Sequence, residues 1–523
     1  MSKKEKKPKY VAKPEDRVST KEAIIYGAAD IFGGGQAAFL SVILLAFFTD
    51  IIGIEAAIAS TIITVSKLWD AISDTGMGLI SDNTRWSKLG RRRPYMIIGG
   101  ILIPFGLAFL FAPIQGLGAE SKIVWMVFAY IIYCTISTVS QVPFMSMASD
   151  ISMDYRERNK ANTYKLLFDI ISGGLLYLIP SLLWGMVREG KVSYMSFYYI
   201  IIFGFGLFFG IPLIVAGIMV KERAPFDRTI KVQFKWKDYF AGLRVKSYMH
   251  HIVMYVAAFL TMDIVSALAI YYTDYIGDFS GNIMGTPAKV FPGAPGFLGE
   301  IPMGSMLVIM PMMVFAAVGI VIAYVLKAKF SKQVAYRTLL PLYVIGAILL
   351  AIYDPRWNMP YLIPIFSGIM GLGFAGAQSM PWLIFPDTVD VAELKLGYRP
   401  TANMSGVMTF ARKAATALGV GMVGWVLTGA GYKPPIQPDN SIVGSEAIFQ
   451  PQPESVYIAI RVFLAVTVAV LLTIGFIAAV RYKVTDKKLE RIRYFVDKRN
   501  EVGVEGFTEE EKAEYDKLVK ELC

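Results

Sequence analysis

Residues 455–480 read SVYIAIRVFLAVTVAVLLTIGFIAAV, an apolar stretch of 26 residues in which Arg461 is the single charged side chain. At about 1.5 Å per residue, a helix of this length extends about 39 Å, more than the roughly 30 Å hydrocarbon core of a bilayer. Because lipid offers backbone amides no hydrogen-bond partner, such a span must close its hydrogen bonds within itself. We therefore predict a transmembrane helix here.

Similar apolar runs recur along the whole chain, at roughly 23–49, 55–80, 95–114, 122–148, 162–187, 196–220, 248–275, 303–327, 337–353, 358–384 and 401–430. Of the 523 residues, 55% are hydrophobic and 18% are charged, and the mean hydropathy is +0.50. A soluble domain cannot bury that much apolar surface, and secreted, fibrous and disordered classes are excluded as well. The predicted fold is an all-α membrane protein with twelve transmembrane helices in two six-helix bundles.

Basic residues predict the orientation of these helices. The N-terminal tail and every second connection are rich in Lys and Arg, as in Arg91, Arg92 and Arg93, whereas the alternate connections carry almost none. By the positive-inside rule both termini are cytoplasmic, in a multi-pass protein of the cell (inner) membrane. The same topology explains the net charge of +11 without nucleic acid, since no basic soluble module interleaved with aromatics is present.

The predicted organisation has five parts: a basic N-tail (1–22), a first bundle (23–220), a cytoplasmic linker (221–247), a second bundle (248–480) and a cytoplasmic C-tail (481–523). Two six-helix halves are typical of transporters built around a central site. The C-tail is predicted to form short amphipathic helices with a capping box from Thr508 to Glu511. The Gly/Pro-rich loop 276–302 is either an outer lid or a passive connection. Cys134 and Cys523 are too far apart in this topology for a disulfide or a metal site.

The segment Lys67-Leu68-Trp69-Asp70-Ala71-Ile72-Ser73-Asp74 places two carboxylates at positions i and i+4 of one apolar helix. Ionised and unpartnered, the two would cost about 5–7 kcal/mol on insertion scales, so a partner must neutralise them. Carboxylate and hydroxyl oxygens suit a small alkali cation or a proton better than a transition metal. The alternative is a structural intrahelical pair between Lys67 and Asp70.

A second motif begins at Gly78 and continues through Asp82 to Arg91, Arg92 and Arg93. It resembles the signature between the second and third helices of the major facilitator superfamily. The resemblance implies that Asp82 and the three arginines form ion pairs that latch the two halves on the cytoplasmic side and break during transport. The simpler alternative is a positive-inside anchor.

Several motifs together point to one family within this superfamily. They are Tyr26-Gly27 through Thr49-Asp50, Trp69 through Asp74, Pro143-Phe144, Asp154 through Arg158, and Asp387-Thr388-Val389-Asp390. Over roughly residues 24–430 the chain is similar to the glycoside-pentoside-hexuronide:cation symporter family. This resemblance implies entry of a solute coupled to Na+, Li+ or H+.

Matched residue by residue, the resemblance implies a cation site. Asp70, Ser73 and Asp74 fall on the family's cation-site segment, Thr138 on its threonine and Lys413 on its membrane-embedded lysine. Two carboxylates and one ammonium leave a single negative charge, which one monovalent cation would cancel. Asp70 and Asp74 would bind Na+ directly if the protein is sodium-coupled. For Lys413 the alternative is a lysine that reaches the membrane surface.

The sugar site departs from that of the family's melibiose carrier, because Gly34, Gln141, Met145 and Leu166 replace its acids, tryptophan and arginine. The candidate substrate-binding residues in this chain are Asp30, Gln141, Met145, Lys165 and Trp382. Each of them has packing as its alternative role.

The prediction is a symporter that imports a sugar or glycoside with Na+ or H+ by alternating access, without a cofactor other than the coupling ion. Three alternatives remain: the same fold carrying a lipid, drug or organic anion, a non-transporting sensor that signals through the C-tail, and a membrane enzyme. The last has little support, because no Ser/His/Asp set, phosphate loop or CxxC pair occurs in a suitable context.

Overall fold

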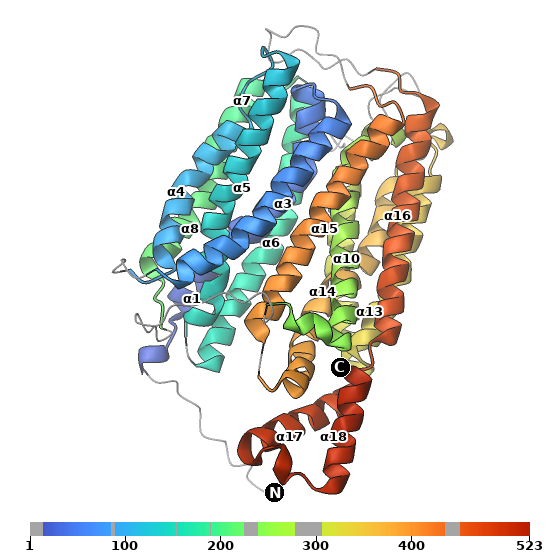
Figure 1. The fold of residues 1–523 in the computed structure, drawn as a ribbon. Helices are drawn as coiled ribbons and strands as arrows, with labels where there is room; N and C mark the ends of the chain where they lie inside the picture. Colours follow the sequence, from blue (N-terminus) through green and yellow to red (C-terminus); the bar gives the residue numbers. More distant parts are fainter. Residues whose placement is uncertain are drawn as a thin grey trace, which may run out of the picture.

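The computed structural model describes residues 14–84, 89–152, 154–188, 190–223, 239–277, 306–398, 400–434 and 450–523. Within these ranges every long element is a helix, which confirms the all-α prediction (Figure 1). Of the predicted segments, the N-tail up to residue 13, most of the linker (224–238) and most of the 276–302 loop lie outside the described residues.

The N-terminal bundle contains α1 (Thr20–Ala28), α2 (Asp30–Ala46), α3 (Ala56–Asp82), α4 (Arg93–Leu110), α5 (Ala119–Asp150), α6 (Tyr155–Arg188), α7 (Tyr194–Tyr199) and α8 (Leu207–Met219). One π-helical segment, Phe47–Ile51, extends α2, and another, Ile200–Gly206, joins α7 to α8. The first predicted span is thus two helices separated at Ala29, and the sixth is α7 continued by α8.

The C-terminal bundle contains α10 (Lys246–Tyr271), α12 (Met306–Lys329), α13 (Lys332–Ile352), α14 (Leu362–Leu396), α15 (Thr401–Gly429) and α16 (Glu454–Arg481). A π-helical segment, Tyr272–Ile276, continues α10. One helix exceeds its apolar run clearly: α14, predicted over 358–384, continues to Leu396, and its extension packs in the apolar core through Val389, Val391 and Leu394.

Ten helical segments of the described chain are long and apolar enough to cross a membrane. Two more, α3 with 27 residues and α15 with 29, are as long but carry ionisable residues along their middle. With these two the described chain has the twelve predicted spans. The two exceptions belong to different bundles and pack against each other, as Figure 1 shows, so the charges are gathered between the bundles.

The C-tail forms a hairpin of α17 (Asp486–Val502) and α18 (Glu509–Leu522), and the predicted capping box of Thr508 and Glu511 is present. Lys498 beside Glu511 lowers the pKa of that carboxyl to about 2. The hairpin docks on the end of α14, where Tyr515 donates a hydrogen bond to the carbonyl oxygen of Leu394 at 2.8 Å. We call this end of the molecule the tail end and the opposite end the distal end (Figure 1).

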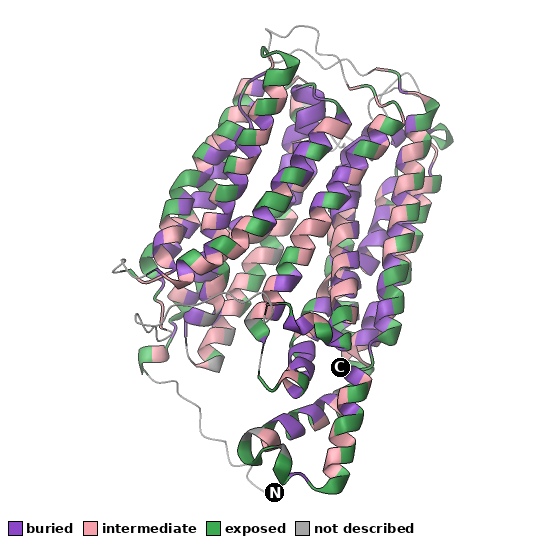
Figure 2. Ribbon diagram, viewed as in Figure 1, coloured by how far each residue is buried: buried purple, intermediate pink, exposed green. Residues whose placement is uncertain are grey.

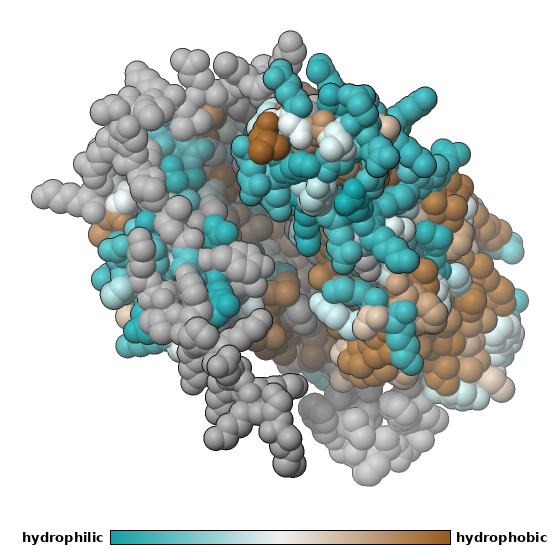
Figure 3. All heavy atoms as spheres, turned by 90° about the horizontal axis from the view of Figure 1, so that it is seen from below, coloured by the Kyte–Doolittle hydropathy of each residue, from teal (hydrophilic) through white to brown (hydrophobic). Residues whose placement is uncertain are grey.

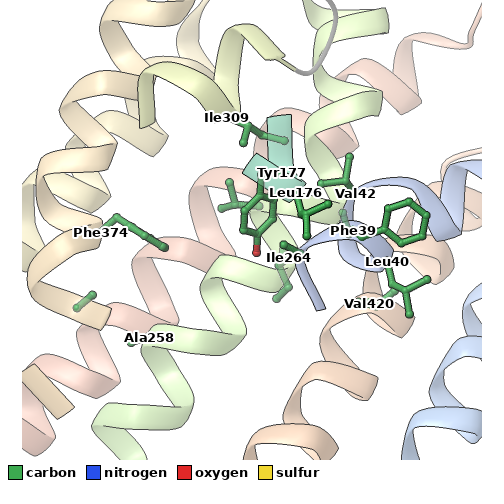
Figure 4. Packing of buried hydrophobic residues seen from close by; sticks show 14 of the residues in the cluster. Phe39, Leu40, Val42, Leu176, Tyr177, Ala258, Ile264, Ile309, Phe374 and Val420 are labelled. Carbon is green, nitrogen blue, oxygen red and sulfur yellow. The ribbon is translucent and has the colours of Figure 1, made fainter. Parts of the chain in front are cut away.

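The two bundles are joined in their distal half. The N–H of Ala57 on α3 donates to Oγ1 of Thr428 on α15 at 2.8 Å, and Oγ1 of Thr64 donates to the carbonyl of Ala417 at 2.9 Å. Apolar side chains from both bundles pack in the same region, among them Val42 of α2 and Ile264 of α10 (Figure 4). The structure is therefore closed at its distal end.

The surface has the polarity of a membrane protein. Exposed residues line the outer faces of the helices and the tail hairpin (Figure 2). Many of the exposed residues on the helices are large and apolar, including Phe128, Val321 and Phe203. Seen from the tail end, hydrophilic residues gather on the near face and hydrophobic residues cover the visible side (Figure 3). The apolar sides suit contact with lipid, which cannot hydrate polar groups.

Candidate functional site

The two carboxylates of α3 project from one face of the helix toward α5 and α15. Asp70 is buried, with 4% of its surface exposed, and Asp74 lies one turn further along the same face. Thr138 of α5, which is 2% exposed, and Lys413 of α15 complete the group. The sequence prediction named all of these residues, and the structure brings them together from three helices and both bundles.

Lys413 and Thr138 contact different oxygens of the two carboxylates. Lys413 Nζ lies 2.9 Å from Oδ2 of Asp70 and 2.6 Å from Oδ2 of Asp74. The other oxygen of each acid, Oδ1, lies 3.0 Å from Thr138 Oγ1. Ser73 Oγ is 3.0 Å from Thr138 Oγ1 and also 3.0 Å from the carbonyl oxygen of Asp70. We call Asp70, Ser73, Asp74, Thr138 and Lys413 the α3 cluster.

The α3 cluster is short of hydrogen-bond donors and of positive charge. Thr138 has one hydroxyl hydrogen, so it can donate to only one of the two Oδ1 atoms at a time. Two carboxylates and one ammonium leave one negative charge in a buried place, where an uncompensated charge is costly. The Oδ1 atoms and the two hydroxyls are hard oxygen ligands, which fit a small monovalent cation, and either carboxylate could instead accept a proton.

Lys67 forms no close ion pair with Asp70 among the described contacts, although its charge acts on that carboxylate at longer range. Lys67 Nζ lies over the ring of Tyr130, 5.9 Å from its centre, while Lys413 from the other bundle reaches both acids. The alternative for Lys413, an extension to the membrane surface, does not hold either. Its ammonium ends between two carboxylates, and its side chain is 18% exposed.

Three of the five candidate substrate residues lie together beside α2. Lys165 Nζ of α6 is 3.2 Å from Oδ2 of Asp30, and Asp30 is 2% exposed. Gln141 of α5 also reaches this place, since its Nε2 lies 4.0 Å from the position that a Cβ on Gly33 would take. Met145 follows Gln141 by about one turn of α5 and is 46% exposed.

Trp382, the fifth candidate, belongs to the other bundle. Its ring meets Tyr255 edge-on with centroids 5.4 Å apart, and Phe259 edge-on at 6.4 Å. About half of its surface is exposed, at 49%. The contacts described for Trp382 are with aromatic rings of the C-terminal bundle, and none of them joins it to Asp30 or Lys165.

An ion pair in the C-terminal bundle was missed by the sequence prediction. The guanidinium of Arg412 on α15 makes a two-fold contact with the carboxylate of Asp263 on α10, with 3.0 Å between Nη2 and Oδ1. Thr416 Oγ1 donates to the same carboxylate at 2.7 Å, and the Phe259 ring lies 4.9 Å from the Arg412 Cζ. Each charge is visible in the sequence within an apolar run, but nothing in the pattern pairs residues on different helices.

The predicted gating residues all have partners within the N-terminal bundle. Arg92 forms an ion pair with Asp82, and Arg91 Nη2 lies 2.8 Å from Oδ2 of Asp150 at the end of α5. Arg93 Nε donates to the carbonyl oxygen of Gly217 on α8 at 2.7 Å. In this conformation the contacts described for these charges lie within one bundle, and their role as a latch between the two bundles stays a prediction.

The distal end has a polar contact between bundles that the sequence prediction did not identify as a gate. Asp50 Oδ1 accepts a hydrogen bond from Thr49 at 2.7 Å and from Tyr432 at 3.2 Å, and Thr49 Oγ1 lies 3.1 Å from the hydroxyl of Tyr271. Thr49 and Asp50 follow α2, while the tyrosines belong to the C-terminal half. These contacts help to hold the distal end closed.

Comparisons with known proteins agree with this architecture. The putative glycoside/cation symporter YagG of Escherichia coli is 24% identical, covering 91% of this chain and 94% of that protein. The putative sulfoquinovose importer of Salmonella typhimurium is also 24% identical, covering 82% of this chain and 85% of that protein. The crystal structure of a D-xylose-proton symporter shares the fold, with a TM-score of 0.54 at 12% identity over 90% of this chain and 97% of the other.

The family model described as MFS/sugar transport protein matches residues 25–486, which include both bundles and every residue of the α3 cluster. Its members and the relatives above are transporters, and the described chain has the helices of a multi-pass membrane protein. The chain is therefore a secondary transporter, and it belongs to the MFS/sugar transport protein family.

Proposed function

We propose that the protein is a symporter that carries a sugar or glycoside together with Na+ or H+ by alternating access, with the cation at Asp70 and Asp74. The observation that carries this proposal is the unbalanced negative charge of the α3 cluster. Lys413 neutralises one of the two carboxylate charges, and Thr138 can donate one hydrogen bond to them. The remaining single negative charge fits one monovalent cation.

The position of the α3 cluster supports coupling between the cation and movement of the bundles. Asp70 and Asp74 belong to the N-terminal bundle and Lys413 to the C-terminal bundle, so any rocking of one bundle against the other changes these contacts. A cation bound to the carboxylates offsets their charge when Lys413 moves away. The five residues of the cluster reach zero net charge only when Lys413 and one monovalent cation are both present, so the loaded state avoids an uncompensated charge inside the membrane.

A hydroxylated solute suits the residues beside the central helices. Gln141 and the Asp30–Lys165 pair offer hydrogen-bond donors and acceptors, and the half-exposed ring of Trp382 offers an apolar platform. The names of the two relatives, a glycoside/cation symporter and a sulfoquinovose importer, point to the same class of solute.

The proposed orientation places both termini in the cytoplasm of a cell with the protein in its inner membrane. The basic connection between α3 and α4 and the tail hairpin lie at the tail end, as the positive-inside rule requires of a cytoplasmic face. The closed distal end then faces outward, and the structure represents a state closed to the outside.

The test is uptake of labelled glycosides by vesicles under an imposed inward gradient of Na+ or of H+. We expect one of the two gradients to drive accumulation, and Asp70→Asn and Asp74→Asn to abolish it. Asp497→Asn, an exposed position on the tail, is the matched control and should behave as the parent. If both membrane variants accumulate solute as the parent does, the cation site is wrongly assigned.

A carrier of an organic anion on the same scaffold is the second candidate. It is favoured by Gly34 and Leu166, which replace sugar-contacting residues of the melibiose carrier. Counterflow with a panel of labelled solutes separates the two functions. Exchange of neutral glycosides supports the first, and exchange limited to organic anions supports the second.

A further inference from the structure

A second group of two acids and one lysine lies between α2 and α6, apart from the α3 cluster. Asp30, at the start of α2, is 2% exposed, and its Oδ2 is buried without a hydrogen bond. The ammonium of Lys165 lies 3.2 Å from this oxygen as an ionic neighbour. Asp169, one turn after Lys165 on α6, interacts with the same ammonium at longer range. We call Asp30, Lys165 and Asp169 the α6 cluster.

Two glycines of α2 make room for these acids. A Cβ on Gly33 would overlap Oδ1 of Asp30, and a Cβ on Gly34 would overlap Oδ1 of Asp169. Both carboxylates therefore lie directly against the α2 backbone, which a larger residue at either position would prevent. Glycine at positions 33 and 34 thus lets the carboxylates of Asp30 and Asp169 both approach the backbone of α2.

The formal charge of the α6 cluster is the same as that of the α3 cluster, because one ammonium again serves two carboxylates. The titratable and polar groups that face it from neighbouring helices are Tyr26 of α1, Gln141 of α5 and Tyr255 of α10, with Asp263 and Arg412 beyond Tyr255. Asp263 and Arg412 pair with each other. None of these neighbours adds a net positive charge to balance the extra carboxylate.

A proton fits this place better than a metal ion. An alkali ion needs several oxygen ligands, but Lys165 already occupies one side of Asp30 and the backbone of Gly33 and Gly34 closes another. A proton needs one carboxylate oxygen. Because Lys165 contacts Asp30 directly, Asp169 is the acid left with the weaker neutralisation.

We propose that the α6 cluster is a second cation-accepting site of this protein, and that its ligand is a proton carried on Asp169. The proton comes from water and bonds to a carboxylate oxygen of Asp169, which becomes neutral, and no electron is transferred. The site is separate from Asp70 and Asp74 and does not depend on which cation binds there. Thr138 and Gln141, one turn apart on α5, connect the two clusters through a single helix.

Infrared difference spectroscopy tests the proposal on the purified full-length protein in lipid. Spectra recorded between about pH 4 and 9 report the carbonyl stretch of each carboxyl group that loses its proton. The parent should show a band from a partly buried carboxyl, and Asp169→Asn should lose it. Asp169→Glu, which keeps the acid on a longer side chain, should restore a band at a shifted position.

The Asp70→Asn/Asp74→Asn double variant distinguishes this inference from the proposed function. The double variant should keep the Asp169 band. It should lose the binding of radioactive Na+, or, for a proton-coupled protein, the titration bands of Asp70 and Asp74. A band that persists unchanged in Asp169→Asn would overturn the inference and leave the α3 cluster untouched. A parent in which no carboxyl titrates in this range would overturn it as well. Melting temperatures of all variants establish that each protein is folded.

Discussion

At Thr138 a single hydroxyl faces two carboxylate oxygens, and this geometry sets the expected consequence of removing it. Replacement of Thr138 by Val keeps the shape and deletes the hydrogen-bond donor and cation ligand. A hydrogen bond to a charged group contributes about 1.5–3 kcal/mol, equivalent to about 10- to 150-fold in affinity. We expect the Na+ or H+ concentration that half-activates uptake to rise by that factor.

Thr138→Ser is the control for this substitution, because it retains the hydroxyl. It should transport with nearly the cation affinity of the parent. Equal activation of the Val variant and the parent would show that Thr138 does not contribute to the cation site.

The single carboxylate of Asp263 has both a charge partner, Arg412, and a hydrogen-bond donor, Thr416. Its charge is therefore balanced, unlike that of the two carboxylates in the α3 cluster. Arg412→Met leaves Asp263, which is 3% exposed, as an isolated buried charge. Breaking one side of such a pair costs about 3–5 kcal/mol. The melting temperature of the purified variant should fall accordingly, and the double variant Arg412→Met/Asp263→Asn should recover part of the loss. No loss in the single variant would refute a structural role.

Asp70 and Asp74 were predictable from the residues alone, because two acids one turn apart in an apolar helix need a partner. Thr138 and Lys413 were assigned only through the family resemblance. Their roles in cation binding remain predictions. Asp263 and Arg412 were equally conspicuous in the sequence, yet 149 positions separate them and no periodicity connects different helices. The packing of α10 against α15, which creates the pair, is a tertiary property.

At the level of elements, the contact between α3 and α15 closes the distal end. Gly424 lies so near α3 that an added Cβ would overlap Oγ of Ser60 and the carbonyl oxygen of Ala56. One of these is backbone and cannot rotate away. The helices can approach this closely only with glycine at that position.

Gly424→Ala should therefore disfavour the distally closed state. Spin labels at Glu55→Cys and Glu454→Cys, exposed positions at the distal ends of the two bundles, should report a longer distance in this variant than in the parent. Gly429→Ala is the matched control on the same helix, because no atom lies within 4 Å of its added Cβ. An unchanged distance in Gly424→Ala would contradict the assigned role of this contact.

The positions of the twelve spans followed from apolar runs, but their ends and interruptions did not. The break at Ala29 and the extension of α14 to Leu396 depend on contacts with other helices and with the tail. The charged residues of α3 and α15 lower their hydropathy, and only packing between the bundles makes them membrane helices. All twelve runs were visible in the sequence, but only ten of the described helices are clearly apolar enough to cross a membrane, and α3 and α15 are the other two.

For the whole molecule, the tail hairpin is bound to the C-terminal bundle by several polar contacts. Arg493 Nε is 3.0 Å from Asp390 Oδ2, Arg499 Nη1 donates to the carbonyl of Glu393 at 2.9 Å, and Ser247 Oγ donates to the carbonyl of Leu522 at 2.6 Å. Its buried residues, including Phe495, join the continuous apolar core. The hairpin thus supports the ends of α10 and α14.

Deletion of residues 485–523 should lower the melting temperature and leave gradient-driven uptake in place, since no residue of either charged cluster belongs to the tail. The melting curve and vesicle uptake of the same preparation check both expectations. A protein that signals through its tail instead of transporting would show no uptake with or without the deletion. Loss of uptake in a deletion variant with the melting temperature of the parent would also contradict this account.

The central claim is that one monovalent cation completes the α3 cluster and thereby favours solute binding. Because such coupling is reciprocal, the cation must change solute affinity by the same factor by which solute changes cation affinity. The most direct measurement is the solute dissociation constant of the purified protein, determined across Na+ concentrations at fixed pH and across pH without Na+. We predict that the dissociation constant falls as one of the two cations is raised. A dissociation constant that changes with neither cation would contradict the claim.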